Sequence, residues 1–180
     1  MSQHKTIIIT GTSSGIGFVL AEYFGKKGHK VYGLSRKHTE SNYFTSIPTD
    51  VTDNDAVQNA IAEVLKTETK IDVLINNAGM GMVGSVEDSS KEDILKLFNL
   101  NLVGAVQMMS AVMPKMRENK FGQIINVSSI GSEMGLPFRG FYSASKSALD
   151  KVTEAMRYEV YPWNVNVCSL HLGDIKTNIA

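Results

Sequence analysis

The sequence predicts a three-layer α/β domain in which a doubly wound parallel sheet carries helices on both faces. Three observations support this fold class. Short β-branched apolar segments alternate with helical patterns along the whole chain. A glycine-rich turn joins the first of these strands to the first helix. No repeat, linker or low-complexity segment divides the 180 residues, so we expect residues 1–180 to form one domain.

Six strands are expected, at residues 6–9, 30–35, 46–50, 71–76, 123–127 and 165–170. The helices between them are expected to begin at residue 18 and to cover residues 53–67, 90–117 and 142–160. Asp53 and Ser90 are suited to cap the second and third of these helices. The helix at residues 90–117 is apolar almost all the way round, which is typical of burial on two sides.

Composition and charge narrow the classes of protein. The formal net charge is +0 without a basic stripe, which argues against nucleic acid as a partner. The apolar runs are too short to span a bilayer, and the N-terminus lacks a signal-peptide pattern, so no membrane association is expected. A single cysteine, Cys168, excludes an internal disulfide and suits the cytoplasm. The four histidines show no metal-ligand spacing, so no metal site is expected.

The glycine-rich turn at residues 10–17, TGTSSGIG, favours binding of an anion. Glycines permit a sharp turn and close approach of a ligand, and a helix N-terminus offers free N–H groups to a pyrophosphate. The spacing is GxxxGxG, which differs from the common GxGxxG, and such turns also occur for packing alone. The residues expected to contact a cofactor here are Gly11, Ser13, Ser14, Gly15, Ile16 and Gly17.

A tyrosine and a lysine four residues apart form the second informative pattern. Tyr142 and Lys146 share one face of the expected helix. A phenol has a reference pKa of about 10 and is a poor base at neutral pH. A nearby ammonium group favours the phenolate, which exchanges a proton with an alcohol or a carbonyl. Taken alone, the pair is better explained by an ordinary amphipathic helix that happens to carry a tyrosine and a lysine.

Several motifs occur together in one order and spacing: TGTSSGIG at residues 10–17, NNAG at residues 76–79, Asn101, Ser129, Tyr142 and Lys146. With this combination the chain resembles the short-chain dehydrogenase/reductase family, from Lys5 to its end. The resemblance implies a single NAD(P)-binding domain with a Rossmann-type sheet. It also implies oxidation of an alcohol or reduction of a ketone or aldehyde by hydride transfer, with a nicotinamide cofactor.

The resemblance also implies a role for each catalytic position. Tyr142 resembles the general acid/base, and Lys146 the cation that favours the phenolate and hydrogen-bonds the nicotinamide ribose. Ser129 would hold the substrate oxygen and the charge that develops on it. Asn101 resembles the helix asparagine that holds a water in the proton relay. Its place in an apolar helix supports a buried partner, and a purely structural polar role is the alternative.

The end of the second strand is expected to select the cofactor. NAD sites usually place an acidic side chain there, whereas this chain has Ser35 and Arg36. A hydroxyl followed by a guanidinium suits a 2′-phosphate, so NADP(H) is expected to be preferred over NAD(H). The further cofactor contacts that the resemblance implies are Asp50, Val51, Asn77, Ala78, Gly79, Gly173, Ile175 and Thr177.

The substrate is expected to be a small-molecule alcohol or carbonyl compound. The loops at residues 79–84 and 134–138 look like those of the steroid/retinol dehydrogenase branch, which suggests an apolar substrate. Flexible methionines also fill irregular gaps in cores, so a packing role for them is the alternative. The candidate pocket walls are Met82, Met134, Leu136 and Phe138.

Three features depart from the family pattern. The segment between Arg36 and Asp50 is too short for the usual helix, and Leu172-Gly173 stands where the family has Pro-Gly. The chain stops at Ala180, where family members continue with a substrate-covering segment, a helix and a seventh strand. We therefore expect the sixth strand to be an apolar sheet edge and interpret the chain as a fragment or an interrupted reading frame.

The leading hypothesis is an NADP-dependent oxidoreductase, and two others stay open. A truncated cofactor-binding protein without turnover would bind the nucleotide but show no reaction. A relative of the sugar-nucleotide epimerases would share the tyrosine–lysine pair, although the GxxxGxG spacing and the short chain disfavour it. Family members are commonly homodimers or homotetramers that pack through the two long helices after strands four and five, and the same is expected here.

Overall fold

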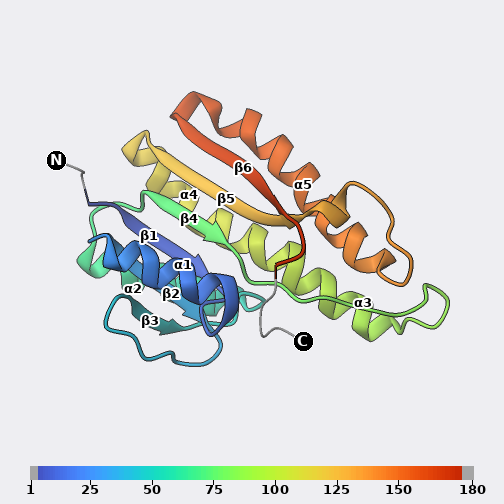
Figure 1. Cartoon of the computed structure of the whole chain (residues 1–180). Helices are drawn as coiled ribbons and strands as arrows, with labels where there is room; N and C mark the ends of the chain where they lie inside the picture. Colours follow the sequence, from blue (N-terminus) through green and yellow to red (C-terminus); the bar gives the residue numbers. More distant parts are fainter. Residues whose placement is uncertain (1–3, 176–180) are drawn as a thin grey trace.

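Six parallel strands form one sheet in the order β3-β2-β1-β4-β5-β6 (Figure 1). The computed structural model describes residues 4–175. The strands are β1 (Thr6–Thr10), β2 (Lys30–Ser35), β3 (Thr45–Pro48), β4 (Val73–Asn76), β5 (Gly122–Ser129) and β6 (Val165–Leu172). This order confirms the predicted doubly wound sheet. From β1 the chain adds β2 and β3 on one side of the sheet, and it then crosses to the other side of β1 to add β4, β5 and β6. At such a switch point between β1 and β4, ligands bind at the carboxyl ends of the strands.

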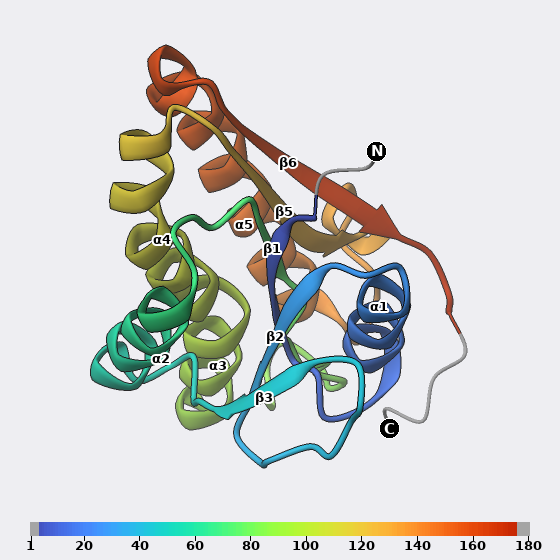
Figure 2. The ribbon, with the colours of Figure 1, turned by 90° about the vertical axis from the view of Figure 1, so that its left-hand side faces the viewer.

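The helices cover the two faces unequally (Figure 2). Helix α1 lies on one face, while α2, α4 and α5 lie on the other. The helices are α1 (Gly15–Lys26), α2 (Asn54–Thr67), α3 (Lys91–Phe98), α4 (Ala105–Asn119) and α5 (Gly140–Val160). Short turns are η1 (Asn99–Gly104), η2 (Ile130–Ser132) and η3 (Tyr161–Trp163).

Each face of the sheet has its own apolar core. On the face of the three helices, β-branched strand residues pack against a methionine-rich side of α4. The main residues of this core are Ile8, Leu74, Ile124, Val57, Val64, Met108, Met109, Val112 and Met116. On the other face, strand residues of opposite pleat pack under α1. This smaller core consists of Ile7, Ile9, Ala21, Val31, Phe44, Val73, Ile75 and Val127. Such alternation buries both faces of a central parallel strand.

Both predicted helix caps are present. The carboxylate of Asp53 accepts hydrogen bonds from the backbone N–H groups of Asp55 (2.9 Å) and Ala56 (3.2 Å) at the start of α2. The hydroxyl of Ser90 accepts from the N–H of Asp93 (3.0 Å) at the start of α3. These side chains satisfy N–H groups that the first helical turn leaves unpaired.

The predicted helix at residues 90–117 is continuous but not uniform. Residues Asn99–Gly104 form a π-helical segment, η1, between α3 and α4. A π segment inserts an extra residue into the helical turn and often marks a functional site. Gly104 ends it against Val51, because a Cβ at this glycine would lie 2.9 Å from Cγ2 of Val51. The helical prediction therefore held, while its regular geometry did not.

This helical stretch has a property that the length of its apolar runs does not show. Among the described residues, Lys91–Asn119 is long and apolar enough to span a membrane, with a mean hydropathy of 1.3. Polar residues interrupt the apolar runs, but the mean hydropathy of the window stays high. Half of the apolar window is buried inside the protein, and the core helix of a sheet protein passes the same test.

The segment between β2 and β3 contains no helix in residues 36–44, as predicted. An aromatic side chain fills part of that space instead. Phe44 is buried and packs edge-on against Phe18 of α1, with ring centroids 6.0 Å apart. Gly33 of β2 makes room for it, since a Cβ at Gly33 would lie 2.6 Å from the Phe44 ring. The shortened loop is thus closed by packing on α1.

Strand β6 forms one edge of the sheet, as predicted. In the part of the chain that the structure describes, it pairs with β5 alone. On the α1 face of this strand Leu170 is 48% exposed and Leu172 is partly buried. Leu170 is therefore an exposed apolar side chain on this edge strand, while Leu172 packs against the core under α1.

Candidate active site

The turn between β1 and α1 requires glycine at three positions. Gly11 and Gly15 have positive φ angles of 73° and 59°, which side chains rarely adopt. A Cβ at Gly17 would collide with the carbonyl oxygen of Gly11. The turn is therefore closed backbone against backbone, and its outer surface is formed by the exposed Ser13 and Ser14.

The N-terminus of α1 differs from those of α2 and α3. Its cap residue, Ser14, makes no side-chain hydrogen bond to the helix, and the first turn contains no acidic residue. The other two helices have both a capping side chain and acidic residues in the first turn. The N–H groups and the positive dipole end of α1 are consequently open to an anion. This arrangement fits the pyrophosphate of a dinucleotide.

The NNAG segment after β4 is locked against this turn by Thr10. The Thr10 hydroxyl accepts hydrogen bonds from the backbone N–H groups of Asn77 (3.0 Å) and Ala78 (2.9 Å). In return, Nδ2 of Asn77 donates to the carbonyl oxygens of Thr10 (3.0 Å) and Gly11 (3.3 Å). Asn77 and Ala78 are thereby held beside the glycine turn, where the sequence predicts cofactor contacts.

The carboxyl ends of β2 and β3 form the corner predicted to choose the cofactor. Ser35 is buried, and its hydroxyl donates to the carbonyl oxygen of Lys37 (2.8 Å), which leaves Arg36 as the exposed group. Asp50 accepts hydrogen bonds from the N–H (2.9 Å) and hydroxyl (2.7 Å) of Thr52. Those bonds, and secondarily the charge of Arg36, hold the pKa of Asp50 below its usual value. The guanidinium and the carboxylate therefore belong to one charged corner.

Asn101 links three segments from inside the π turn. It is 1% exposed, and its Oδ1 accepts from the N–H of Met80 (2.8 Å). Its Nδ2 donates to the carbonyl of Met80 (3.0 Å) and to the hydroxyl of Ser145 (3.1 Å). Ser145 in turn donates to the carbonyl of Tyr142 (2.8 Å). The loop after β4 and the start of α5 are thus joined through one buried amide.

Lys146 is a buried cation on the face of α5 that it shares with Tyr142. It is 5% exposed, and its Nζ donates to the carbonyl oxygen of Val127 in β5 (2.8 Å). Burial lowers the pKa of Lys146 to about 8, while the charge of Asp150, one turn further along α5, opposes that shift. Desolvation disfavours the ammonium form, so the lysine is poised to titrate close to physiological pH.

Ser129 ends β5 opposite the start of α5. Its hydroxyl accepts from the N–H of Gly131 (3.1 Å), and its carbonyl accepts from the hydroxyl of Ser132 (2.7 Å). A Cβ at Gly131 would lie 3.3 Å from the Ser129 oxygen and 3.7 Å from the hydroxyl of Ser143. Gly131 therefore lies between the hydroxyl of Ser129 and that of Ser143 in α5.

The remaining predicted residues lie around this centre. Gly79 is adjacent to it, because a Cβ there would lie 3.2 Å from Oδ1 of Asn101 and 3.4 Å from Nζ of Lys146. Gly173 and Ile175 are exposed beyond β6, and Thr177 lies outside the described residues. Of the predicted pocket walls, Met82 and Leu136 are half-buried, and Met134 and Phe138 are exposed.

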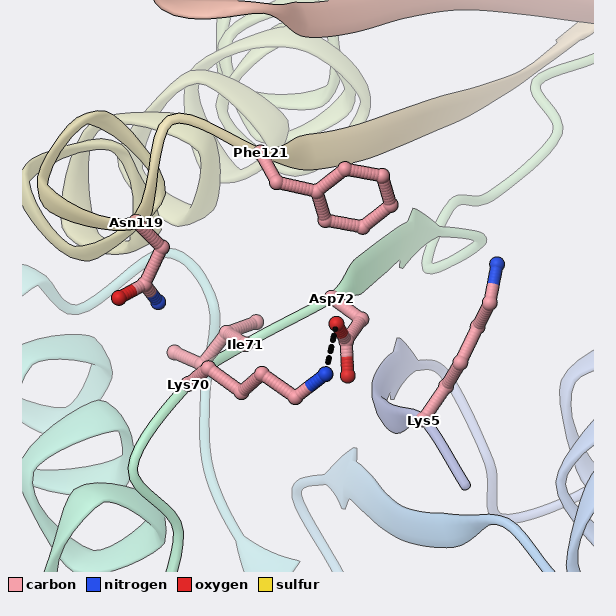
Figure 3. Close-up of a pocket in the computed structure, with 6 residues that line it drawn as sticks. All are labelled: Lys5, Lys70, Ile71, Asp72, Asn119 and Phe121. Carbon is pink, nitrogen blue, oxygen red and sulfur yellow. Dashed lines mark ion pairs between the residues drawn. The ribbon is translucent and has the colours of Figure 1, made fainter. Parts of the chain in front are cut away.

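A separate cavity of about 350 Å³ lies at the opposite, amino ends of the strands and contains none of the predicted residues. It is lined by Lys5, Lys70, Ile71, Asp72, Asn119 and Phe121 (Figure 3). Here Asp72 binds Nζ of Lys70 (2.9 Å) and accepts from the N–H of Thr6 (2.8 Å). That carboxylate joins the starts of β1 and β4 and is structural.

Sequence reasoning missed two residues that hold the site. Thr10 belongs to the glycine motif, but its hydroxyl serves the NNAG segment rather than a ligand. Ser145 precedes Lys146 and is fully buried, where it carries the hydrogen bond from Asn101. For Ser145 the only signal was a serine on the packed face of α5. In the sequence, such a serine cannot be distinguished from a small residue that is present because of close packing.

Comparison with known proteins agrees with this geometry. The model of the short chain dehydrogenase family matches residues 5–180. The chain belongs to that family. It is 43% identical over 176 residues to a 3-ketodihydrosphingosine reductase of Bacteroides thetaiotaomicron, covering 97% of this chain and 65% of that protein. The chain therefore spans somewhat less than two thirds of the length of that relative.

Two solved structures extend the comparison to the cofactor. ElxO with NADP bound has a TM-score of 0.92 and 29% identity, covering 98% of this chain and 76% of that one. A 4-hydroxyisoleucine dehydrogenase complexed with NADH has a TM-score of 0.90 and 30% identity, covering 97% and 78%. Short-chain dehydrogenases thus bind nicotinamide cofactors in this fold, and the uncapped α1 terminus with its glycine turn fits one.

Proposed function

We propose that this chain is the cofactor-binding and catalytic part of an NADP(H)-dependent oxidoreductase that interconverts an alcohol and a ketone or aldehyde. The observation that carries the proposal is the buried Lys146 ammonium, held on β5 one helical turn from Tyr142. A buried cation is costly, and a position of this kind is characteristic of functional groups. Its surroundings, Asn101 and the glycine turn, provide the rest of the site.

The residues of the chain divide the work of such a reaction. The bound cofactor supplies or accepts the hydride. In the reducing direction Tyr142 gives its hydroxyl proton to the carbonyl oxygen of the substrate, and Ser129 donates a hydrogen bond to the same oxygen. Lys146 stabilises the phenolate that remains. Asn101 acts as a positioning residue, because its amide is already bound to Met80 and Ser145.

Arg36 supports a preference for NADP(H). The Ser35 hydroxyl is directed at the Lys37 carbonyl, so the exposed guanidinium is the group at this corner that suits a 2′-phosphate. Arginine binds phosphate oxygens through paired, charge-assisted hydrogen bonds. Asp50, the nearby carboxylate, is engaged by Thr52 and by the charge of Arg36.

An apolar carbonyl compound is the substrate class that the rim of the site supports. Four apolar side chains stand in solvent around it: Val83 (73% exposed), Phe138 (66%), Met134 (61%) and Ile130 (55%). They belong to the loop after β4 and to the segment between β5 and α5. The similarity to a 3-ketodihydrosphingosine reductase supports a ketone with a long alkyl chain as the first compound to test.

The test of the reaction is the Tyr142→Phe variant assayed with NADPH and a long-chain ketone. We expect turnover to fall by a factor of about 10²–10⁴, because the proton donor is lost. NADPH affinity, measured by fluorescence titration, should stay within twofold of the parent chain. Turnover that persists in Tyr142→Phe refutes the assigned acid/base, and binding without any turnover in the parent chain supports a cofactor-binding protein instead.

The test of the cofactor is Arg36→Glu, with Lys37→Glu as the matched control at the neighbouring exposed position. Both variants change the charge equally, but Arg36→Glu alone should shift the ratio of NADP(H) to NAD(H) affinity by about a hundredfold or more, since a charge-assisted pair becomes a repulsive one. Equal shifts in the two variants would show that the effect is general electrostatics.

We also propose that two copies of the chain associate through the helices after β4 and β5. Leu95 (58% exposed) and Val103 (40%) leave an apolar strip on α3 and η1, and Tyr158 (72%) is exposed on α5. Exposed apolar strips on long helices are typical of subunit interfaces. Light scattering at micromolar concentration should give a dimer or tetramer, and a Leu95→Lys variant should shift it toward monomer.

The proposed oxidoreductase activity requires no metal, nucleic acid or membrane, and we expect the protein to be located in the cytoplasm.

A further inference from the structure

Three metal-ligating side chains that are distant in sequence meet beside the candidate site. His171 in β6 places Nε2 3.1 Å from Oδ2 of Asp150 in α5 and Nδ1 3.5 Å from Oε1 of Glu133, which follows η2. One nitrogen and two carboxylate oxygens of this group lie within 4.8 Å of one another. Spacings of 17 and 21 residues gave no ligand pattern in the sequence, so only the folded chain shows the cluster.

We propose that Glu133, Asp150 and His171 form a binding site for a divalent transition-metal ion of the zinc type. An imidazole and two carboxylates are ligands that Zn²⁺ accepts, and three protein ligands leave its fourth position to water. Ligands at about 2.0–2.1 Å from a tetrahedral ion lie about 3.3 Å apart, close to the separation of His171 and Asp150. Glu133 is the adjustable ligand: its oxygen lies nearer to the other ring nitrogen, Nδ1, and its side chain, which is 65% exposed, turns to reach an ion bound to Nε2.

Buried polar groups behind the cluster support it. Ser128 of β5 is in register with His171, so both side chains lie on the same face of the sheet. Ser128 is 3% exposed, yet within residues 4–175 its hydroxyl has no hydrogen bond of regular geometry, and neither does the buried Oδ1 of Asp150. The two groups lie close enough for the hydroxyl to act on the carboxyl. A buried hydroxyl behind a carboxylate is the outer partner that orients a metal ligand.

The charge of the cluster also suits a cation. Two carboxylates, those of Glu133 and Asp150, face one imidazole, that of His171. Two cations lie nearby. Lys151 pairs with Glu154 (2.8 Å) and also interacts electrostatically with Glu133 and Asp150, and the buried Lys146 interacts electrostatically with Asp150.

Isothermal titration of the whole 180-residue chain with ZnCl₂ in a non-chelating buffer tests the proposal. We expect one ion per chain, and affinity at least about tenfold lower in His171→Gln and in Asp150→Asn, since even outer-shell changes cost 10–100-fold. His38→Gln, at an exposed histidine of the loop between β2 and β3, is the matched control and should leave the affinity unchanged. Circular dichroism verifies that each variant is folded.

Cobalt(II) provides a second measurement that does not depend on the variants. A tetrahedral nitrogen–oxygen site gives visible absorption bands of Co²⁺, which ZnCl₂ should abolish in equimolar amount. MgCl₂ should not compete, because Mg²⁺ demands octahedral oxygen ligands. Absence of ZnCl₂ binding by the parent chain overturns the proposal, and so does equal binding by His171→Gln and the parent. Neither result depends on NADPH turnover, so the proposed oxidoreductase activity is tested separately.

Discussion

The cofactor side and the substrate side of the candidate site are built in opposite ways. On the cofactor side, Thr10 and Asn77 exchange four hydrogen bonds with their neighbours, and the glycine turn closes on itself. On the substrate side, the loop after β4 meets the segment before α5 through a backbone hydrogen bond from Gly84 to Phe138 (2.8 Å), while apolar side chains face solvent. One side is locked by polar contacts, and the other is a loosely joined apolar rim.

This difference predicts that the cofactor side tolerates few substitutions and that the substrate side tolerates many. A pyrophosphate needs backbone groups at fixed positions, so the turn tolerates little alteration. An apolar substrate is recognised by shape and area, which exposed side chains on loops can adapt. Lys146 and Asn101 lie on the border between the two sides. Substitutions on each side and at the border therefore have distinct expected effects.

The largest effect is expected at Lys146, the buried cation between the two sides. Its pKa is about 8 in the folded chain against the usual 10.5, so between these values the unfolded chain binds more protons and stability rises with pH. The penalty for the buried ammonium is complete below pH 8 and amounts to about 3 kcal/mol.

We expect Lys146→Met to be more stable than the parent at pH 7, with a difference that shrinks as the pH rises from 8 to 10.5. Urea unfolding across this range measures the difference. Turnover with NADPH should be lost in the variant. A difference in stability that does not vary with pH would mean that the lysine is not desolvated.

The cofactor side should be broken by Gly17→Ala. The new methyl group collides with the carbonyl of Gly11, so we expect a loss of about 1–3 kcal/mol in stability and at least tenfold weaker NADPH binding. Gly81→Ala is the matched control, because nothing lies within 4 Å of a Cβ at that exposed position. Thermal unfolding and fluorescence titration provide the two readouts, and similar losses in both variants would contradict the comparison.

The border should also respond to Asn101→Ala. Removing the amide leaves the N–H and carbonyl of Met80 without their buried partner, which costs about 1–3 kcal/mol. Asn99→Ala changes an exposed residue of the same π segment and should stay within about 0.5 kcal/mol of the parent. If the two variants unfold at the same urea concentration, Asn101 does not join the two sides.

The smallest effect is expected on the substrate side, at Phe138. This residue has a φ of 60°, a conformation that favours glycine, and its side chain is 66% exposed. In Phe138→Gly the relief of strain and the added freedom of the unfolded chain nearly cancel, so stability should change by less than about 1 kcal/mol. KM for an apolar ketone should rise while the Kd for NADPH is unchanged. A changed Kd would show that the two sides are coupled.

The sequence predicted the sheet and its elements well where local signals are strong. β-Branched segments identified all six strands, with β2 at its observed bounds, and Asp53 and Ser90 marked the starts of two helices. Residues 122 and 128–129 were missed at the ends of β5, because glycine and serine carry little strand preference. Pairing with β4 and β6 makes these residues extended.

Side-chain networks could not be predicted, because they depend on tertiary contacts. Asn126 is fully buried, accepts from Asn76 (2.9 Å) and donates to Thr153 (2.8 Å), and these residues lie on three elements. Asn101 was assigned to the site, but its two hydrogen-bonding partners, Met80 and Ser145, were not identifiable from spacing. The Glu133–Asp150–His171 cluster has the same origin. Sequence patterns locate elements and motifs, whereas the partners of buried polar atoms emerge only on packing.

The π segment at Asn99–Gly104 makes the helix sensitive to the length of the chain rather than to its composition. A π turn contains one residue more than an α turn, so deletion of a single residue from this segment would restore regular α-helical geometry. The restored helix would turn α4 by about 100° relative to α3 and carry Met108 and Val112 away from the sheet. Reversal of the insertion that places Asn101 in the site would therefore require the main core to repack.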